Sequence, residues 1–479
     1  MCLLNPRGWD DFVRHSCGLF SSKFIQAGMD LGRSRRFIFI RARVSGEAQP
    51  QYIVLYVRQA ISQQLCLRGR ATLVEKLGVL SSANSENEAR SQASELLQHR
   101  PPPDIIQLPD LHENYIMSHA KFLELAPADD DINVPVIDST KELICRDLWV
   151  VKGSTSVQDY KHSMRNKFGV NSVIGFTRVE DTCKFSDDSL SLEPSNILPS
   201  PGGPQIRDIR IHVRSFSEVQ GVRRLADAKT PRQFVTAVVH AMLGHFNLWN
   251  SQGILHCGIN PDSILITDAT PRDSISEITA ASKLTACQGV LLGEDTGRSV
   301  HESLSIEGEI DTDGLDLLYY LPIRVLWAKL HNRPGNRDIW DDLESALWVM
   351  IFEYLKIVAR VNPKFEYKPL LHYDEMFSTT DGSSILRAKH VIIVEWLLRD
   401  TAPGFGPFRE FFTLWYKLLD DGSSDTLQSL RDFFERILSY VAREKGDWDS
   451  WEAFWEAGGG YEEAYFLQKL EAFNRWVGD

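Results

Sequence analysis

The segment with the clearest capacity for chemistry is GILHCGINPDSILITD, residues 253–268. It places His256 between an apolar pair at 254–255 and an apolar run at 264–266, with Asp262 in the polar stretch between them. A lone histidine in such surroundings is more often a core residue than a catalytic one. The importance of His256 therefore depends on the segments that accompany it and on the elements that position it.

Five other short segments are candidates for the same site. In chain order they are LRGRATLVEKL at 67–77, RDLW at 146–149, GVLLGED at 289–295, LPIRVL at 321–326 and DDLES at 341–345. The first is typical of a strand, a turn and a strand, and RDLW lies inside the strand-like run LICRDLWVV. Each of these two segments is weak evidence for a shared site by itself. The order of all the segments along the chain is the stronger evidence.

A long helix is predicted directly before the His256 loop. Thr230 stands at an N-cap position, Pro231 follows in the first turn, and Gly253 lies where the helix should stop. Apolar residues recur along one face at Phe234, Val238, Met242 and Leu248. This helix would deliver the chain to the loop at a fixed point.

The chain changes character near residue 230. Before it, β-branched and aromatic runs predict strands: RRFIFIRARV, QYIVLYVRQA, LICRDLWVV and IRDIRIHVRSF. After it, amphipathic runs predict further helices: DDLESALWVMIFEYLKIVAR, SSILRAKHVIIVEWLLRD, FGPFREFFTLWYKLL and DTLQSLRDFFERILSYVARE. The fold class is therefore α+β. We expect an N-terminal extension at 1–64, a β-rich region at 65–222 and a helical region at 223–479.

An insertion of about sixty residues, 81–140, separates LRGRATLVEKL from RDLW, which is long for a connection inside a compact domain. Residues 81–90 lead into a possible helix, and the Pro run at 101–103 ends it. The acidic stretch 126–138 is interpreted as an exposed loop.

Together, these segments resemble the fungal-type protein kinase domain, in a degenerate form. In that family the loop reads H-R-D-x-x-x-x-N, a K-D-x-W strand carries the lysine on the ATP phosphates, and G-x-L-I-D-x-D binds metal. The resemblance implies a two-lobed protein-kinase-like fold with a β-rich N-lobe and a helical C-lobe. Phosphoryl transfer would need the loop Asp as base, an Asn and an Asp for Mg²⁺, and the Lys.

By this resemblance, none of the reacting positions is intact. Gly258 occupies the position of the catalytic base, and Ser263 and Gly293 occupy the positions of the metal ligands. Arg146 occupies the position of the lysine. A planar guanidinium does not replace a compact ammonium. Lys152, in the run WVVK, is an alternative for the lysine.

The resemblance also bears on the roles of several other residues. Arg324 replaces the family's activation-segment Glu, while Asp262 and Asp295 lie near the vacated positions and are interpreted as surface acids. The family's nucleotide-binding turn corresponds to Gly69, Arg70, Ala71 and Thr72, with Lys152 as the weakly supported phosphate contact.

Two structural residues remain: His256 and Asp342. The resemblance implies that Asp342 accepts backbone N–H bonds from the loop, with His256 packed beneath. Substitution of the neighbouring Asp341 is expected to have almost no effect on stability. The sequence thus predicts a pseudokinase, a binding or regulatory module for a protein partner. No cofactor is expected; ATP and Mg²⁺ enter only under two alternatives. One is a divergent Ser/Thr kinase using Lys152 with Asp262 or Asp295, and the other is a small-molecule phosphotransferase.

The composition of the chain argues against several other classes of function and location. A formal net charge of -13 and the lack of a Lys/Arg run argue against nucleic-acid binding. No apolar run is long enough for a membrane span, and charges with Trp9 occupy the place of a signal-peptide core. Seven scattered cysteines without a C-x-x-C pair indicate reduced thiols instead of disulfides or a zinc site. We expect an intracellular protein, cytoplasmic or nuclear.

Overall fold

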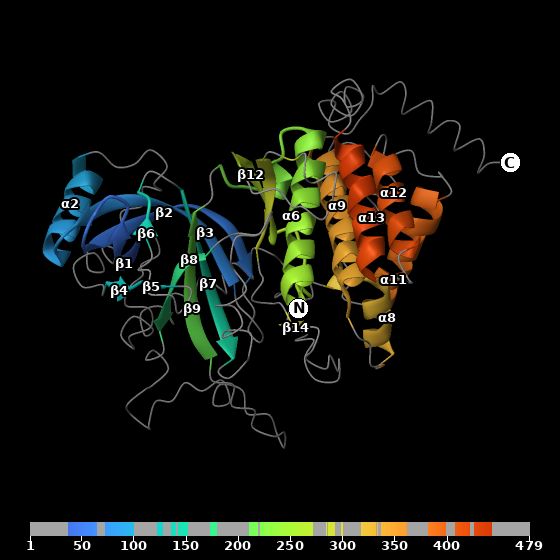
Figure 1. Ribbon diagram of the computed structural model, residues 1–479, viewed down its shortest axis with the longest axis horizontal. Helices are drawn as coiled ribbons and strands as arrows, with labels where there is room; N and C mark the ends of the chain where they lie inside the picture. Colours follow the sequence, from blue (N-terminus) through green and yellow to red (C-terminus); the bar gives the residue numbers. More distant parts are fainter. Residues whose placement is uncertain are drawn as a thin grey trace, which may run out of the picture. The chain divides into compact units, whose positions relative to one another are not determined.

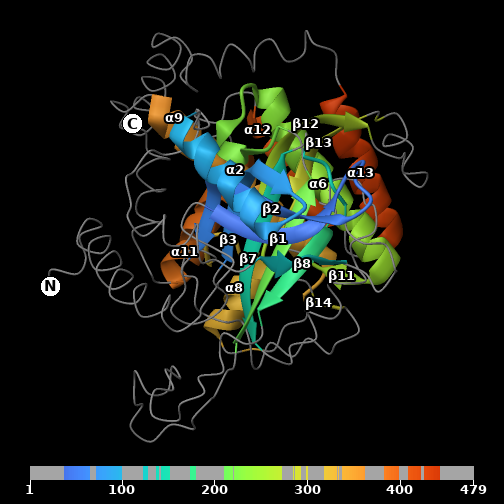
Figure 2. The same ribbon diagram turned by 90° about the vertical axis from the view of Figure 1, so that its left-hand side faces the viewer.

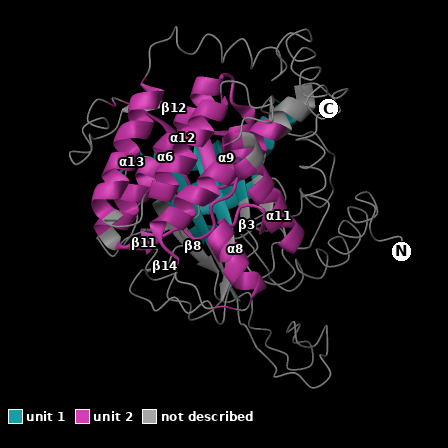
Figure 3. Ribbon diagram, turned by 90° about the vertical axis from the view of Figure 1, so that its right-hand side faces the viewer, with its two compact units in different colours: residues 1–65, 70–155, 173–218 teal, residues 66–69, 156–172, 219–479 magenta. Residues whose placement is uncertain are grey.

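The computed structural model describes residues 37–64, 72–99, 122–127, 136–139, 142–151, 173–179, 210–218, 221–271, 284, 286–292, 298–299, 318–331, 333, 337–361, 382–398, 408–421 and 426–442. The chain divides into two compact units, coloured separately in Figure 3. Unit 1 takes residues 1–65, 70–155 and 173–218, and unit 2 takes 66–69, 156–172 and 219–479.

Within the described residues, unit 1 is built on a nine-stranded sheet with the order β4-β1-β2-β3-β7-β9-β8-β5, and β6 also pairs with β1 (Figure 1). Its strands are β1 (Phe37–Val44), β2 (Pro50–Gln64), β3 (Thr72–Ala83), β4 (Leu123–Glu124), β5 (Ala126–Pro127), β6 (Val136–Ile137), β7 (Leu143–Val151), β8 (Val173–Val179) and β9 (Arg210–Glu218). The long neighbours run antiparallel, whereas β4 and β6 lie parallel to β1.

Because side chains alternate across a strand, the sheet of unit 1 buries a core on each face. One face carries Phe39, Val54 and Leu80, and α2 (Glu86–His99) packs on it through Ala89 and Ala93. Figure 2 shows α2 lying across the strands. The small alanine side chains let the helix approach the sheet closely. The opposite face has its own core, which includes Ile38, Ile40, Leu55, Leu77, Leu143 and Phe216.

Two parts of unit 1 differ from the sequence expectations. The boundary at residue 64 separates segments that the structure joins, since β1 and β2 precede it yet pair with each other and with β3. The stretch 126–138 is not simply an exposed loop. Ile137 is fully buried and Val136–Ile137 pairs with β1, so apolar packing outweighs the acidic composition around it. Residues 128–135 lie outside the described residues.

Unit 2 is mainly helical in its described part. Its helices are α6 (Pro231–Gln252), α8 (Ile323–Leu330), α9 (Ile339–Val361), α11 (Gly382–Val391), α12 (Phe408–Asp421) and α13 (Thr426–Val441), with the short η2 (Leu225–Asp227) and the π-helical turn η5 (Ile392–Leu398). Two small sheets accompany them, β10 (Arg223–Arg224) with β12 (Ile264–Pro271) and β13 (Ala286–Leu291), and β11 (Ile254–Leu255) with β14 (Arg298–Ser299).

Helix α6 is the central element of the unit 2 core, and its predicted ends are confirmed. The Thr230 hydroxyl accepts the Gln233 N–H at 3.1 Å, and Gly253 ends the helix in the left-handed region with φ 64°. Phe234, Val238 and Met242 are fully buried, as are most residues of α9 beside it. Strand β13 passes so close that a Cβ on Gly289 would lie 1.9 Å from the Ala237 carbonyl oxygen. The α6 C-terminus therefore sets a fixed starting point for the loop that follows.

The prediction of an α+β fold is confirmed, with a curled sheet in the earlier part of the chain and helices in the later part. No helix in the described ranges has the length and apolar character needed to cross a membrane.

Candidate functional site

The candidate site is the loop from His256 to Ser263, which connects β11 to β12 in unit 2. It begins three residues after the left-handed cap of α6. The loop lies against the N-terminal turn of α9, which supplies Asp342. Three segments that are distant in sequence therefore build the site: the end of α6, the loop and the start of α9.

Asp342 holds the beginning of the loop. Its Oδ2 accepts the His256 N–H at 2.8 Å and its Oδ1 accepts the Cys257 N–H at 3.0 Å. His245 Nε2, from α6, lies 2.9 Å from Oδ2. Burial would raise the pKa of this carboxyl, but the hydrogen bond of His245, together with the nearby His245, His256 and Arg337 side chains, outweighs burial and lowers the pKa. Asp342 is therefore an ionised acceptor for two loop donors, of which the His256 N–H is buried and the Cys257 N–H is half-buried.

Both ring nitrogens of His256 are occupied within the loop. Nε2 lies 2.8 Å from the Leu292 carbonyl oxygen, and Nδ1 accepts the Gly258 N–H at 3.3 Å. Because Nδ1 accepts a hydrogen bond, it carries no proton, and Nε2 must be the donor. The hydrogen-bond pattern therefore assigns the neutral tautomer with the proton on Nε2. The ring is 1% exposed. His256 thus fixes the loop to the chain beyond β13, and neither nitrogen is available to a substrate.

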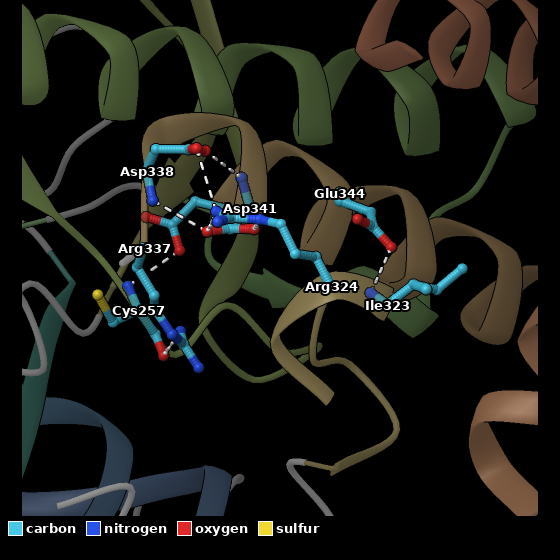
Figure 4. Close-up of polar contacts among 8 residues, drawn as sticks. Cys257, Ile323, Arg324, Arg337, Asp338, Asp341 and Glu344 are labelled. Atoms are coloured by element: carbon cyan, nitrogen blue, oxygen red, sulfur yellow. Dashed lines mark hydrogen bonds and ion pairs between the residues drawn. The ribbon is translucent and has the colours of Figure 1, made fainter. Parts of the chain in front are cut away.

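Cys257 has the one positive φ angle among described residues other than glycine, at 60°. This left-handed conformation costs on the order of 1–2 kcal/mol for a residue with a Cβ. Its N–H is bound by Asp342 and its carbonyl oxygen accepts a hydrogen bond from Arg337 Nη1 at 2.5 Å (Figure 4). The surrounding contacts therefore impose the strain, as is common in loops at functional sites.

The second half of the loop closes on itself through Asn260 and Ser263. Asn260 Oδ1 accepts the N–H groups of Asp262 at 2.9 Å and Ser263 at 3.1 Å, and its Nδ2 donates to the Gly258 carbonyl oxygen. The Ser263 hydroxyl accepts the Asn260 N–H at 3.0 Å and donates to the Asn260 carbonyl oxygen at 2.7 Å. Ser263 is 5% exposed, so its hydroxyl is a structural group of this turn.

The described residues of this loop do not fit a bound Mg²⁺. Position 258 has no side chain, and the Ser263 hydroxyl is already paired within the turn. Asp262 lies near Arg224: the side-chain hydrogen bond that Arg224 donates to Asp227 raises the pKa of Arg224, and the charge of Asp262 adds to that rise. Among the described residues, no group of three His, Cys, Asp or Glu side chains is arranged to hold a metal ion. Gly293 and Asp295 lie outside the described residues.

Gly69 belongs to unit 2 and the other four nucleotide-binding candidates belong to unit 1, and most of the five fall outside the described residues. Gly69, Arg70 and Ala71 lie in the connection between β2 and β3, which the structure does not describe, and Lys152 is likewise outside. Thr72 begins β3, where its backbone pairs with Gln64 and Leu148.

Strand β7, which carries RDLW, pairs with β3 and β9. Arg146 lies opposite Val74 on β3, and its side chain is 8% exposed. The next residue, Asp147, forms a buried ion pair with Arg214 across the strand pair, with Oδ1 2.7 Å from Nε. No local sequence pattern predicts a role for Arg214, because its partner lies 67 residues away.

The start of α9 contains a second polar cluster, which no local sequence pattern predicts. Arg324 of α8 forms ion pairs with Asp338 at 3.1 Å and with Asp341 at 2.5 Å, and Figure 4 shows these side chains together. Asp341 is 3% exposed and also accepts the Asp338 N–H. Burial, then the charge of Asp338, raise the pKa of Asp341 to about 7, although Arg324 opposes them. The expectation that Asp341 would be silent is wrong, because its carboxyl is buried and bonded.

A buried lysine lies behind the same helices. Lys389 of α11 is fully buried, donates to the Leu321 carbonyl oxygen, and places Nζ 4.4 Å from the centre of the Trp348 ring. Burial lowers the pKa of Lys389 to about 7. Glu344 of α9 accepts the Trp348 Nε1–H and the Ile323 N–H, which fixes the first turn of α8. No local pattern identifies Lys389, since its partners lie on other helices.

Comparison with known protein families gives a match to the family described as fungal protein kinase, over residues 128–354. The matched region contains the RDLW strand, the His256 loop and the first part of α9 with Asp342. It begins after the 67–77 segment. No curated protein matches the chain.

Proposed function

Through residues 128–354 this chain belongs to the fungal protein kinase family, and from that premise we propose that it is a pseudokinase. In this proposal it keeps the kinase fold, transfers no phosphate, and acts as a binding or regulatory module for a protein partner. Such a protein needs no ATP or Mg²⁺ for its activity.

The observation that carries the proposal is the state of positions 258 and 263 in the loop. A kinase loop presents an Asp to the substrate hydroxyl and an Asn to Mg²⁺. Here Gly258 offers no carboxylate, and the hydroxyl of Ser263 is bonded twice to Asn260. Neither position can perform its chemical role without rebuilding the turn.

The loop is nevertheless firmly held, which supports a retained fold. Asp342 binds two backbone donors, His256 uses both ring nitrogens, and Cys257 is kept in a strained conformation. Contacts of this kind stabilise a loop shape whether or not chemistry occurs there. Their presence beside the substituted reacting positions is what we expect of a folded, inactive relative.

The direct test is phosphoryl transfer from ATP labelled in the γ-phosphate. We expect no autophosphorylation and no transfer to a peptide mixture or to small alcohols and sugars. Transfer that survives purification and disappears in Lys152→Ala would refute the proposal. Peptide acceptors would then indicate the divergent protein kinase, and small acceptors the phosphotransferase.

The reversal test asks whether only the reacting groups are missing. The variant Gly258→Asp, Ser263→Asn, Gly293→Asp supplies the oxygen ligands that Mg²⁺ takes beside ATP phosphates and water. The matched control places Asn at the same three positions, with nearly the same volume and no added carboxylate. Calorimetric titration with ATP should show Mg²⁺-dependent binding in the Asp-bearing variant alone. If both variants fold and neither binds, the assignment of these positions to a kinase site is wrong.

A further inference from the structure

Helix α8 exposes an aromatic side chain on a face with basic neighbours. Trp327 is 40% exposed, and among the large apolar side chains in the described ranges it is the one exposed aromatic. Its ring stacks on His331 with the ring centres 4.5 Å apart, and Arg333 Cζ lies 5.2 Å from the Trp327 ring centre. Arg324, Trp327 and His331 are spaced i, i+3 and i+7, so they follow one face of the helix.

The same segment is strongly basic within an acidic protein. Residues 323–337 contain Arg324, Lys329, Arg333 and Arg337 and no acidic residue, while the whole chain has a formal charge of -13. Arg324 has its acidic partners on α9, Asp338 and Asp341. In the described part of the chain, Lys329, Arg333 and Arg337 form no ion pair with a carboxylate.

The basic groups also lie close enough to repel one another. Burial lowers the pKa of Lys329, and the charge of Arg337 lowers it further. An anionic group placed between these side chains would relieve the repulsion. The local chemistry therefore favours a negatively charged ligand beside the exposed ring.

We propose that the surface formed by Trp327, Lys329, His331 and Arg333, here called the α8 surface, binds an acidic peptide segment of a partner protein. Tryptophan and arginine are the residue types that most often dominate binding energy at protein interfaces. An acidic segment matches the charge of the α8 surface, and an apolar side chain within it would cover the Trp327 ring. This proposal rests on the proposed function only in treating the chain as a binding protein. Its test measures peptide binding and does not involve phosphate transfer.

A protein partner is favoured over nucleic acid and membrane by the charge of the rest of the chain. Both of those partners present an extended negative surface, which a chain of charge -13 repels outside a small basic area. A short acidic segment needs to meet only the basic area. A narrow patch with one exposed ring suits such a segment best.

The test uses the full chain and a short fluorescein-labelled peptide of Asp and Glu with one central Leu. The comparison probe is the same peptide with Asn and Gln. Fluorescence polarisation at low salt should show binding of the acidic probe, weakening as salt rises, and no binding of the neutral one. Because the protein as a whole is acidic, general electrostatic attraction cannot produce this result.

Two substitutions locate the site, and two matched controls exclude a general effect. Trp327→Ala and Arg333→Glu should each weaken binding of the acidic probe about tenfold or more. Lys417→Glu, an exposed charge change on α12, and Leu398→Ala, an exposed apolar truncation at 44% exposure, should leave it within about twofold. Denaturation midpoints close to that of the parent protein would show that all four variants are folded.

Several outcomes would overturn the proposal. One is no binding of the acidic probe, and another is equal loss in the control variants. A third is tighter binding of an oligouridylate, or of vesicles containing phosphatidylserine, that Trp327→Ala abolishes; this would assign the α8 surface to nucleic acid or membrane instead. Success or failure here is independent of the phosphate-transfer assay, so the two proposals are tested separately.

Discussion

Replacing Asp342 with alanine removes the acceptor for two backbone donors at the start of the His256 loop. The His256 N–H is fully enclosed and the Cys257 N–H is half-buried, so both lose a partner that water does not fully replace. Each stranded buried donor costs about 1–3 kcal/mol, with Cys257 at the low end. The His245 side chain also loses its carboxylate. We therefore expect the free energy of unfolding to fall by about 3–5 kcal/mol.

A graded series makes this prediction specific. Asp342→Asn keeps the shape and one acceptor oxygen but turns an amide N–H₂ toward a backbone donor, so it should cost roughly half as much as alanine. Asp338→Asn is the matched control on the same turn. The Asp338 side chain is 50% exposed, and the Oδ1 that accepts the Asp341 N–H is retained in asparagine. Its effect should stay within about 0.5 kcal/mol.

The assay combines urea denaturation with residue-resolved thiol labelling. Release of the loop should speed labelling of half-buried Cys257 in Asp342→Ala, while Cys145 and Cys287, both buried in other elements, keep their rates. The reasoning is refuted if Asp342→Ala costs less than about 1 kcal/mol. It is also refuted if all three cysteines are labelled faster to the same extent, because the effect would then be global and not centred on the loop.

Two further predictions concern buried charges. Burial and the charge of Asp338 raise the pKa of Asp341 to about 7, so the folded state holds a proton that the unfolded state releases near pH 4. The unfolding free energy should therefore fall, on the order of 3 kcal/mol, as the pH rises from about 4 to about 7. Asp341→Asn should lack this slope in denaturation midpoints across that range, and parallel curves would contradict the assignment. In unit 1, Asp147→Ala or Arg214→Ala alone should cost about 3–5 kcal/mol, because each removes the ion-pair partner of a fully buried charge. A double-mutant cycle should give a cost well below the sum, and strict additivity would exclude the pair.

The features that followed from the sequence are mostly local ones. The ends of α6 were predictable because Thr230, Pro231 and Gly253 act within a few residues of themselves. The long strands and helices followed from their apolar spacing. The proximity of Asp342 to the loop, 86 residues earlier, came only from resemblance, since no local pattern joins positions so far apart.

What the sequence did not reveal depends on packing between distant segments. Asp341 and Asp342 are adjacent and chemically identical, yet one faces Arg324 and the other faces the loop. Ile137 lies in an acidic stretch and is buried because β1 provides an edge for it. Lys389 is spaced like any polar residue of a helix and becomes buried only when Trp348 covers it. In each case the partner, and not the local spacing, determines the environment.

In the proposed pseudokinase, the substituted positions differ in what stands in place of the reacting group, and the difference bears on how the chain stays folded. Gly258 lacks a side chain, and its N–H and carbonyl oxygen are bonded within the loop. Ser263 makes hydroxyl bonds that an asparagine could not reproduce at the same length. Arg324, where the resemblance implies a glutamate, pairs with the carboxylates of Asp338 and Asp341 at the start of α9. These replacements build new structural contacts instead of leaving vacant ones. Selection for folding alone, without selection for phosphate transfer, would favour that outcome, which is what the proposed pseudokinase requires.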